Sequence, residues 1–272
     1  MKALRFAGIA FVAGLLLFPL YLMVVHSFTP ATVVMKFPPD LLPFDFTTFN
    51  YEYMAALPFF WRWVVNLGWI TVATVALAVV VNCAAGYAFA YGKFPGKAVL
   101  FWLMMAPMFV TRFVLIISQY VLFGKLGLRG YLAVVIIQLF SSMQIFLARN
   151  YFSAIPLSMA ESARMDGASE WTILMRIILP ISKSLVGATV AFLGMSVMGD
   201  FIWQMLQLVD PAKKTLIVGL VQSTQRAGFG GSGNLGYNLA VGTVLIIPYM
   251  IIFAASSRYF ISGVKITAEV ER

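Results

Sequence analysis

The sequence is poor in charge: only 11% of its 272 residues are Asp, Glu, Lys or Arg, whereas 61% are hydrophobic. A soluble domain usually carries about 25% charged residues, so this chain lacks the polar surface that water requires. It also has a single cysteine, Cys83, and a single histidine, His26. One cysteine cannot form a disulfide framework, and one histidine excludes His-based catalytic or metal constellations. We therefore expect no catalytic residue and no metal site in this chain.

The chain also lacks a G-x-x-x-x-G-K-[ST] phosphate loop, so we expect it to bind no nucleotide or other cofactor itself. Its net charge of +9 does not indicate nucleic-acid binding, because the basic residues are scattered at the ends of apolar stretches. Lys and Arg gather at such places to face lipid headgroups and to fix orientation. The expected partner is therefore membrane lipid, with no nucleic acid.

Long apolar runs replace the missing charge. A spanning helix needs about 20 mostly apolar residues. Six segments meet or nearly meet that length: 6–25, 64–91, 98–122, 131–148, 185–208 and 237–257. We predict an all-α membrane protein with six transmembrane helices.

The first run resembles a signal peptide, because Lys2 and Arg5 precede it. It is longer than the apolar core of a typical signal peptide, and no A-x-A cleavage site follows it, so we interpret it as a membrane anchor. Six spans place both termini on the same side. With the N-terminus inside, eleven basic residues face inward and seven face outward, which predicts that both termini are cytoplasmic.

The longest inner loop, residues 149–184, carries strong helical signals. Ser158 and Glu161 match a capping box at the start of a helix. Gly167 can supply the left-handed residue that ends this helix, and Ser169 can cap a second one that Pro180 stops. The sequence therefore predicts a bent pair of short helices.

Small residues in this loop, Ala160, Ala163 and Gly167, recur at helical spacing. They predict a flat helix face that another protein can approach closely. Capping by itself would explain Glu161 without any contact to a partner.

The spacing of the loop is that of a known motif. Glu161-Ser162-Ala163, three residues, Gly167, nine residues and Ile177-Ile178-Leu179-Pro180 resemble the EAA loop of binding-protein-dependent ABC importer permeases. Asp166, which precedes the glycine, resembles the carbohydrate-uptake subgroup, and the similarity to maltose-permease G-type and glycerol-phosphate permease E-type subunits extends over nearly the whole chain. The resemblance assigns ATPase coupling to Glu161, Ser162, Ala163, Asp166, Gly167, Leu179 and Pro180.

The resemblance implies a type I ABC importer permease fold, with a five-helix core and an added N-terminal helix. It divides the chain into a first helix and outer loop (1–60), a core (61–258) with the coupling loop at 156–180, and a cytoplasmic tail (259–272). The implied partners are a second related permease, two cytosolic ABC ATPase subunits and an extracytoplasmic solute-binding protein. ATP with Mg would bind to the partner ATPase, and the complex would lie in the bacterial inner membrane.

The implied function is half of a solute pathway for a sugar, an oligosaccharide or a polyol phosphate. Two alternatives remain at this point. Importer permeases for amino acids or polyamines share the EAA loop, and an ion-coupled secondary transporter would explain the spans without partners. A secondary transporter usually carries buried ionisable pairs or broken helices in repeated halves.

Candidate solute contacts are polar residues within the apolar spans. Asp200, Trp203, Gln204 and Gln207 share a three- and four-residue spacing, which predicts one polar and aromatic stripe on a single helix. The stripe would face a water-filled path or pack against the partner permease. Asn82, Gln138 and Gln144 are further candidates, which could bind a polyol or join helices.

Two charged residues, Arg112 and Asp200, lie within predicted spans. Charges at membrane depth mark solute pathways or buried pairs. The alternative is that each lies at the end of a span and reaches the headgroups.

Overall fold

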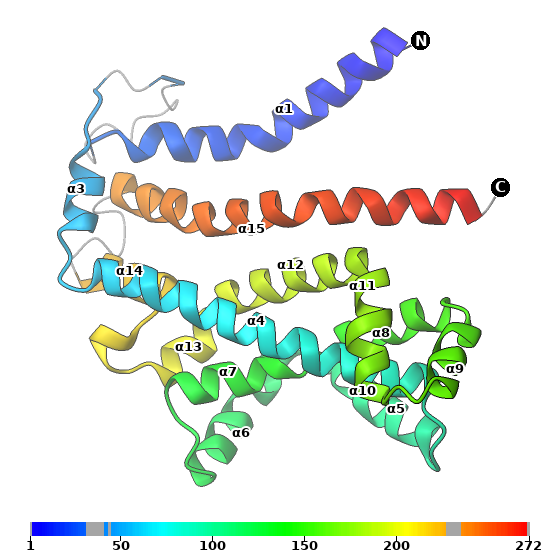
Figure 1. Cartoon of the computed structure of the whole chain (residues 1–272). Coiled ribbons are helices and arrows are strands. Elements are labelled where there is room, and N and C mark those ends of the chain that lie inside the picture. Colours follow the sequence, from blue (N-terminus) through cyan, green and yellow to red (C-terminus); the bar gives the residue numbers. More distant parts are fainter. Residues whose placement is uncertain (1, 31–40, 43–44, 227–234, 271–272) are drawn as a thin grey trace. The chain divides into compact units, whose positions relative to one another are not determined.

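Helices account for every regular element in the residues that this computed structural model describes, which are 2–30, 41–42, 45–226 and 235–270 (Figure 1). The predicted all-α class is confirmed. The α-helices are α1 (Lys2–Ser27), α3 (Phe49–Ala55), α4 (Phe60–Tyr91), α5 (Lys97–Met105), α6 (Arg112–Lys125), α7 (Tyr131–Leu139), α8 (Ser142–Ser153), α9 (Leu157–Met165), α10 (Glu170–Ile173), α11 (Leu179–Ile181), α12 (Lys183–Gly199), α13 (Phe201–Gln207), α14 (Leu216–Arg226) and α15 (Leu235–Val270). Parts of the predicted outer loop (31–40 and 43–44) and the end of the predicted tail (271–272) lie outside the described residues.

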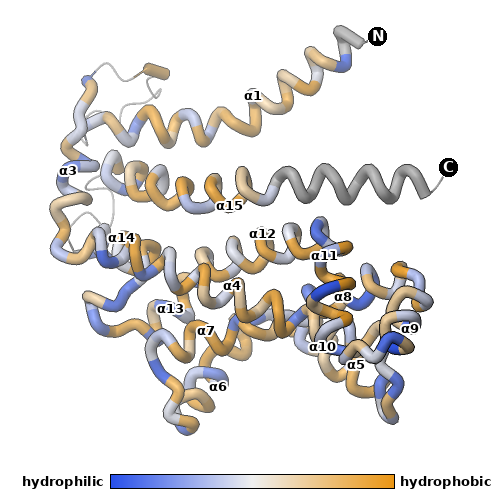
Figure 2. The backbone as a smooth tube through the Cα atoms, in the orientation of Figure 1, coloured by the Kyte–Doolittle hydropathy of each residue, from blue (hydrophilic) through white to orange (hydrophobic). Residues whose placement is uncertain are grey.

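Four helical stretches of the described chain are long and apolar enough to cross a membrane, and the number rises to six if each of two bent helix pairs is one span. The four are Arg5–Ser27, Phe60–Tyr91, Tyr131–Ser153 and Leu235–Ser256. Large apolar side chains are exposed along α1, which is hydrophobic over most of its length (Figure 2). Apolar surface of this extent is stable in lipid or against a partner and not in water. The chain is a multi-pass membrane protein.

The predicted third span, 98–122, is not one helix. Helix α5 is followed by a 3₁₀ turn over Ala106–Phe109 that contains Pro107, and Val110 and Thr111 are extended. The two halves, Lys97–Phe109 and Arg112–Lys125, meet at 109°. Proline and the tighter turn interrupt the helical hydrogen bonds, which hydropathy alone does not reveal.

The predicted fifth span, 185–208, is also interrupted. Helix α12 ends at Gly199, and α13 begins at Phe201 after Asp200, whose backbone has a non-helical ψ of 62°. At its other end, α12 meets the preceding helical segment, Glu170–Ile181, at 89° across Ser182. This elbow connects the inner loop to the span.

The described chain forms two compact units. One comprises Met1–Asn66 with Asp210–Tyr249, and the other comprises Leu67–Val209 with Met250–Arg272. All residues to which the sequence assigns coupling or solute contact lie in the second unit. The division at residues 60 and 258 that the resemblance implies stays a prediction.

Close packing in the first unit depends on Trp63. Its indole Nε1 donates to the carbonyl oxygen of Pro211 at 2.7 Å, and its ring lies directly on Gly219 of α14. A Cβ atom at Gly219 would lie 2.2 Å from the ring atom Cδ2 of Trp63. Because the indole is fixed by its hydrogen bond, the contact admits only glycine.

Gly219→Ala should therefore destabilise the protein by about 1–3 kcal/mol, the usual cost of overpacking a well-packed site. Thermal unfolding in detergent measures this change as a lower midpoint. Gly68→Ala is the matched control, since a Cβ at this glycine of α4 would meet nothing within 4 Å. An equal midpoint for the two variants would contradict the close contact.

Candidate coupling loop and polar cavity

The inner loop begins with two short helices joined at a glycine. Helix α9 ends at Met165, and Gly167 has a φ of +82°, in the left-handed region that favours glycine. Ser169 then caps α10, and its side chain accepts a hydrogen bond from the backbone N–H of Thr172 at 3.2 Å. The predicted terminator and the predicted second cap are both confirmed.

The predicted capping box at Ser158 is wrong. Helix α9 already begins at Leu157, after Pro156, and no side chain caps it. The φ that the proline ring fixes suits the start of a helix, so the helix begins one residue earlier than the Ser-x-x-Glu pattern indicates.

The predicted stop at Pro180 is also misplaced. The chain forms a π-helical turn over Leu174–Ile178, and α11 then carries Pro180 in its first turn, where a missing N–H is tolerated. The helical run continues to Ile181, and Ser182 interrupts it before α12.

The small residues of α9 face the interior of this chain. Ala160 is fully buried and Ala163 is nearly so, in a core cluster with Cys83 of α4, Phe152 of α8 and Ile173 of α10. The prediction that this face receives another protein is therefore wrong. The small side chains instead let α9 lie close to its own neighbours, as in other close helix packings.

An ion pair joins the two short helices, and a tyrosine of α4 binds the same glutamate. Arg164 donates from Nε to Oε1 of Glu170 at 2.6 Å and from Nη2 to Oε2 at 3.1 Å, and the Tyr87 hydroxyl donates to Oε2 at 2.6 Å. This hydrogen bonding to Glu170 raises the pKa of the Arg164 guanidinium above its ordinary value. A bidentate pair restricts geometry as well as adding energy. These hydrogen bonds join α9, α10 and the end of α4 to one another.

The opposite face of the loop is exposed and partly apolar. Its most exposed large apolar side chain is Met165, at 88%, and Trp171 is 55% exposed. The exposed polar residues beside them in the chain are Glu161, Ser162 and Asp166. Exposed apolar side chains of this size mark contact with either a protein or a membrane. The residues assigned to coupling are thus divided, with Glu161, Ser162 and Asp166 exposed and Ala163 buried.

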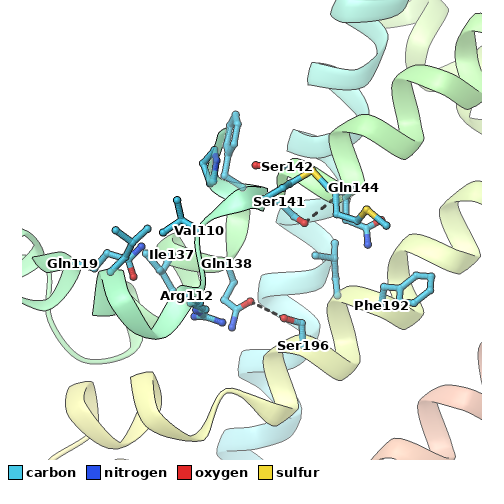
Figure 3. A pocket seen from close by; sticks show the side chains of 16 residues that line it. Val110, Arg112, Gln119, Ile137, Gln138, Ser141, Ser142, Gln144, Phe192 and Ser196 are labelled. Carbon is cyan, nitrogen blue, oxygen red and sulfur yellow. Dashed lines mark hydrogen bonds between the residues drawn. The ribbon is translucent and has the colours of Figure 1, made fainter. Parts of the chain in front are cut away.

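A polar cavity of the second unit lies beside the break between α5 and α6 and the break between α7 and α8 (Figure 3). Its volume is about 340 Å³. The polar residues that line it are Arg112, Gln119, Gln138, Ser141, Ser142, Gln144 and Ser196. They come from α6, α7, α8, α12 and the break before α8, and Figure 3 shows Gln138 bonded to Ser196.

The charged residues of the spans form a pair at the cavity. Arg112 Nη2 donates to Asp200 Oδ2 at 2.6 Å, and Gln138 Nε2 donates to the same oxygen at 2.8 Å. The Arg112 side chain is 43% exposed and lines the cavity, whereas the Asp200 side chain is 8% exposed. Neither residue simply reaches for headgroups; the pair joins two helix interruptions 88 positions apart in the chain.

Asn82 holds the break between α7 and α8. Its Nδ2 donates to the carbonyl oxygens of Ala78 at 2.6 Å and Leu139 at 3.0 Å, and its Oδ1 accepts from the Ser141 N–H at 2.9 Å. Both ends of the amide are occupied by backbone groups. Its role in this arrangement is to satisfy the interrupted backbone.

Three members of the predicted stripe, Trp203, Gln204 and Gln207, lie on α13, but the chain itself buries them. Trp203 and Gln204 are fully buried. The Trp203 indole donates to the Ala133 carbonyl oxygen at 3.2 Å, and Gln204 Nε2 donates to the Val197 carbonyl oxygen at 2.6 Å. A three- and four-residue spacing predicts that the residues share one helix face, but it does not predict what packs on that face. Here other parts of the same chain pack on it.

The other candidates fall in two places. Gln138 and Gln144 line the polar cavity, whereas Gln207 lines a separate cavity of about 400 Å³ with Lys125 and Arg129. In the polar cavity, Oε1 of Gln144 and Oε1 of Gln119 are buried and have no hydrogen-bond partner among the described residues. Sequence reasoning missed Gln119, Ser141, Ser142 and Ser196, because single polar residues within apolar spans carry no pattern.

Curated relatives match the chain along nearly its full length. The galactooligosaccharides transport system permease protein GanQ of Bacillus subtilis is 30% identical over 264 residues, covering 94% of this chain and 90% of GanQ. The chain belongs to the carbohydrate ABC transport permeases. Another such permease, the arabinooligosaccharides transport system permease protein AraQ of Halalkalibacterium halodurans, is 29% identical and covers 95% of this chain and 93% of its own.

Two further comparisons agree with this family. The sn-glycerol-3-phosphate transport system permease protein UgpE of Brucella suis is 26% identical, covering 90% of this permease and 89% of its own chain. A solved structure of a bacterial ABC transporter involved in the import of the acidic polysaccharide alginate has the same fold, with a TM-score of 0.80 at 23% identity over 95% of this chain and 96% of the other. Comparison with models of known protein families finds no match. The predicted family and permease fold are confirmed, whereas the roles of single residues stay predictions.

The ion pair of Arg112 and Asp200 predicts that two variants of this permease differ in stability. Arg112→Ala removes the cation from the buried Asp200 carboxylate and should destabilise the protein by about 1–3 kcal/mol, a cost reduced by the partial exposure of the arginine. Asp200→Asn keeps an oxygen that both donors can reach and leaves a cation that solvent can reach, so it should cost less.

Thermal unfolding midpoints of the two variants in one detergent measure the difference. A lower midpoint for Asp200→Asn than for Arg112→Ala would show that the carboxylate is not the buried, dependent member of the pair.

Proposed function

We propose that this chain is one transmembrane half of an ATP-driven importer for a sugar, an oligosaccharide or a polyol phosphate. A second related permease would supply the other half of the pathway. Two cytosolic ABC ATPase subunits would bind ATP with Mg and drive the cycle, and an extracytoplasmic solute-binding protein would deliver the solute. The complex would lie in the bacterial inner membrane with both termini of this chain in the cytoplasm.

The observation that carries the proposal is the pairing of an exposed, rigid loop with a polar cavity through one helix. Helix α4 contacts the loop through Tyr87 and the cavity lining through Asn82. A helix rises about 1.5 Å per residue, so these two contacts lie about 8 Å apart along α4. Motion of the loop would therefore be transmitted directly to the break beside the cavity.

The lining of the cavity supports a hydroxyl-rich solute. Amides and hydroxyls can each donate and accept hydrogen bonds, as sugar hydroxyls do, and Arg112 adds one cation for a polar or anionic group. The named relatives transport arabinooligosaccharides, galactooligosaccharides and sn-glycerol-3-phosphate, which share this chemistry. The cavity of one permease would be half of the binding surface.

Coupling would occur on the exposed face of the loop. Met165 is the natural anchor in a pocket of the ATPase, and Glu161 and Asp166 would form the charged rim. The bidentate pair of Arg164 and Glu170 keeps this face fixed relative to α4, so that force is transmitted and not absorbed.

Met165→Glu should weaken the ATPase contact and lower both ATPase co-purification and solute uptake, by about 30-fold if Met165 contributes the 2 kcal/mol typical of an interface anchor. Leu126→Glu is the matched control, an exposed apolar residue placed on the outer side by the predicted topology. It should leave the ATPase bound. Equal loss of ATPase in both variants, or in neither, would contradict the proposed coupling face and orientation.

The cavity predicts opposite effects on stability and transport. Gln144→Leu removes an unpartnered buried oxygen, so it should leave the unfolding midpoint unchanged or raised while uptake falls several-fold. Asn82→Leu leaves backbone groups of Leu139 and Ser141 unpaired and should lower the midpoint by the equivalent of about 1–3 kcal/mol for each group.

Uptake of radiolabelled oligosaccharide into cells and unfolding of the purified complex provide the two measurements. Full uptake by a stable Gln144→Leu complex would remove the polar cavity from the solute pathway.

A further inference from the structure

An apolar groove lies in the angle of the elbow between α11 and α12, against α15. It is the most voluminous of the described cavities, at about 560 Å³. Its lining residues are Met175, Leu179, Pro180, Lys183, Val186, Gly187, Val190, Ile252, Ala255 and Ser256. All except Lys183 and Ser256 are apolar, and the Ser256 hydroxyl donates to the carbonyl oxygen of Ile252 in its own helix at 2.6 Å. Lys183 is thus the single charged group among the described residues that line the groove.

The predicted topology places the groove at the inner face of the membrane. Lys183 lies at the end of the predicted inner loop (149–184), and Ser256 lies at the end of the predicted sixth span (237–257). Val190 lies about 10 Å deeper along α12, at 1.5 Å per residue. The mouth of the groove is therefore at headgroup depth and its walls are at acyl-chain depth.

The positive charge of Lys183 favours a negatively charged occupant of the groove. Lys183 is exposed and makes no hydrogen bond or ion pair with any residue that the structure describes. No carboxylate is among the described residues that line the groove. A lysine above an apolar slot matches a negative headgroup above an acyl chain. A zwitterionic headgroup would carry its own cation to the same place and gain less.

We propose that this groove binds one anionic phospholipid, with its phosphate on Lys183 and an acyl chain along Val186 and Val190. Leu179 and Pro180, which end the coupling loop, form part of the same wall. The lipid therefore fills the inner side of the 89° elbow that joins the loop to α12. A lipid that fits one elbow angle better than others shifts the permease toward that angle, so the lipid composition regulates coupling.

The test measures lipid retention, which does not depend on the identity of the solute or on transport. The complete importer is placed in nanodiscs with equal amounts of phosphatidylglycerol and phosphatidylcholine, and the lipids that stay bound after gentle extraction are counted by native mass spectrometry. The wild-type protein should retain phosphatidylglycerol about fivefold over phosphatidylcholine, the preference expected from one lysine near a headgroup.

Three lysine variants separate this site from general attraction to a basic surface. Lys183→Gln should abolish the preference and Lys183→Arg should keep it. Lys93→Gln is the matched control, because Lys93 is an exposed cation on the same predicted face but outside the groove. Unchanged retention in Lys183→Gln, or equal loss in Lys93→Gln, would overturn the proposal.

A further variant tests the groove itself. Ala255→Trp fills the slot while Lys183 remains, and it should release the lipid from an intact complex. Retention of the lipid by this variant would overturn the proposal. So would dissociation of the second permease with the lipid content unchanged, since the groove would then be a protein interface.

Discussion

The structure depends on satisfying backbone groups where helices break inside an apolar protein. No water reaches such groups in a bilayer, and each unpaired one costs several kcal/mol. The amide of Asn82 meets this need at the break before α8, and Asp200 lies at the break between α12 and α13, where Arg112 and Gln138 neutralise and bind it. The polar cavity exists because these breaks exist. Its lining is a consequence of how the breaks are stabilised.

Helix α4 connects this cavity to the loop at the membrane face. Asn82 fixes the cavity side, while Tyr87 binds Glu170 and the Tyr91 hydroxyl donates to the Phe152 carbonyl oxygen at 2.8 Å. These three side chains lie within ten residues of a single helix. A rigid helix held at both places passes displacement with little loss, which is the physical requirement for coupling an event outside the membrane to a cavity within it.

Local patterns in the sequence predicted local features well. Apolar length predicted four of the six spans as continuous stretches. A glycine predicted the left-handed turn at Gly167, and a serine predicted the cap at Ser169. Long-range contacts were beyond such patterns. The spacing of Ala160 and Ala163 predicts a flat helix face, but it does not say whether that face contacts the same chain or another protein. Likewise, Trp203 has the same sequence context whether its ring faces a pathway or, as here, Phe123 at a centroid distance of 5.3 Å.

The unpartnered amide oxygens of the cavity bear on how a pathway must bind its solute. Burying Oε1 of Gln119 and Oε1 of Gln144 without a hydrogen-bond partner costs about 1–3 kcal/mol each. Selection for stability alone would not keep these two groups. In the proposed pathway, a solute hydroxyl would recover that cost on entry, which would draw the solute in without any strong ionic contact. The one strong group, Arg112, is already bound to Asp200, so its attraction for the solute is reduced. Conduction requires sites that are favourable enough to enter and weak enough to leave. Neutral amides beside a compensated cation meet that requirement, whereas a free buried charge would hold an anionic solute in place.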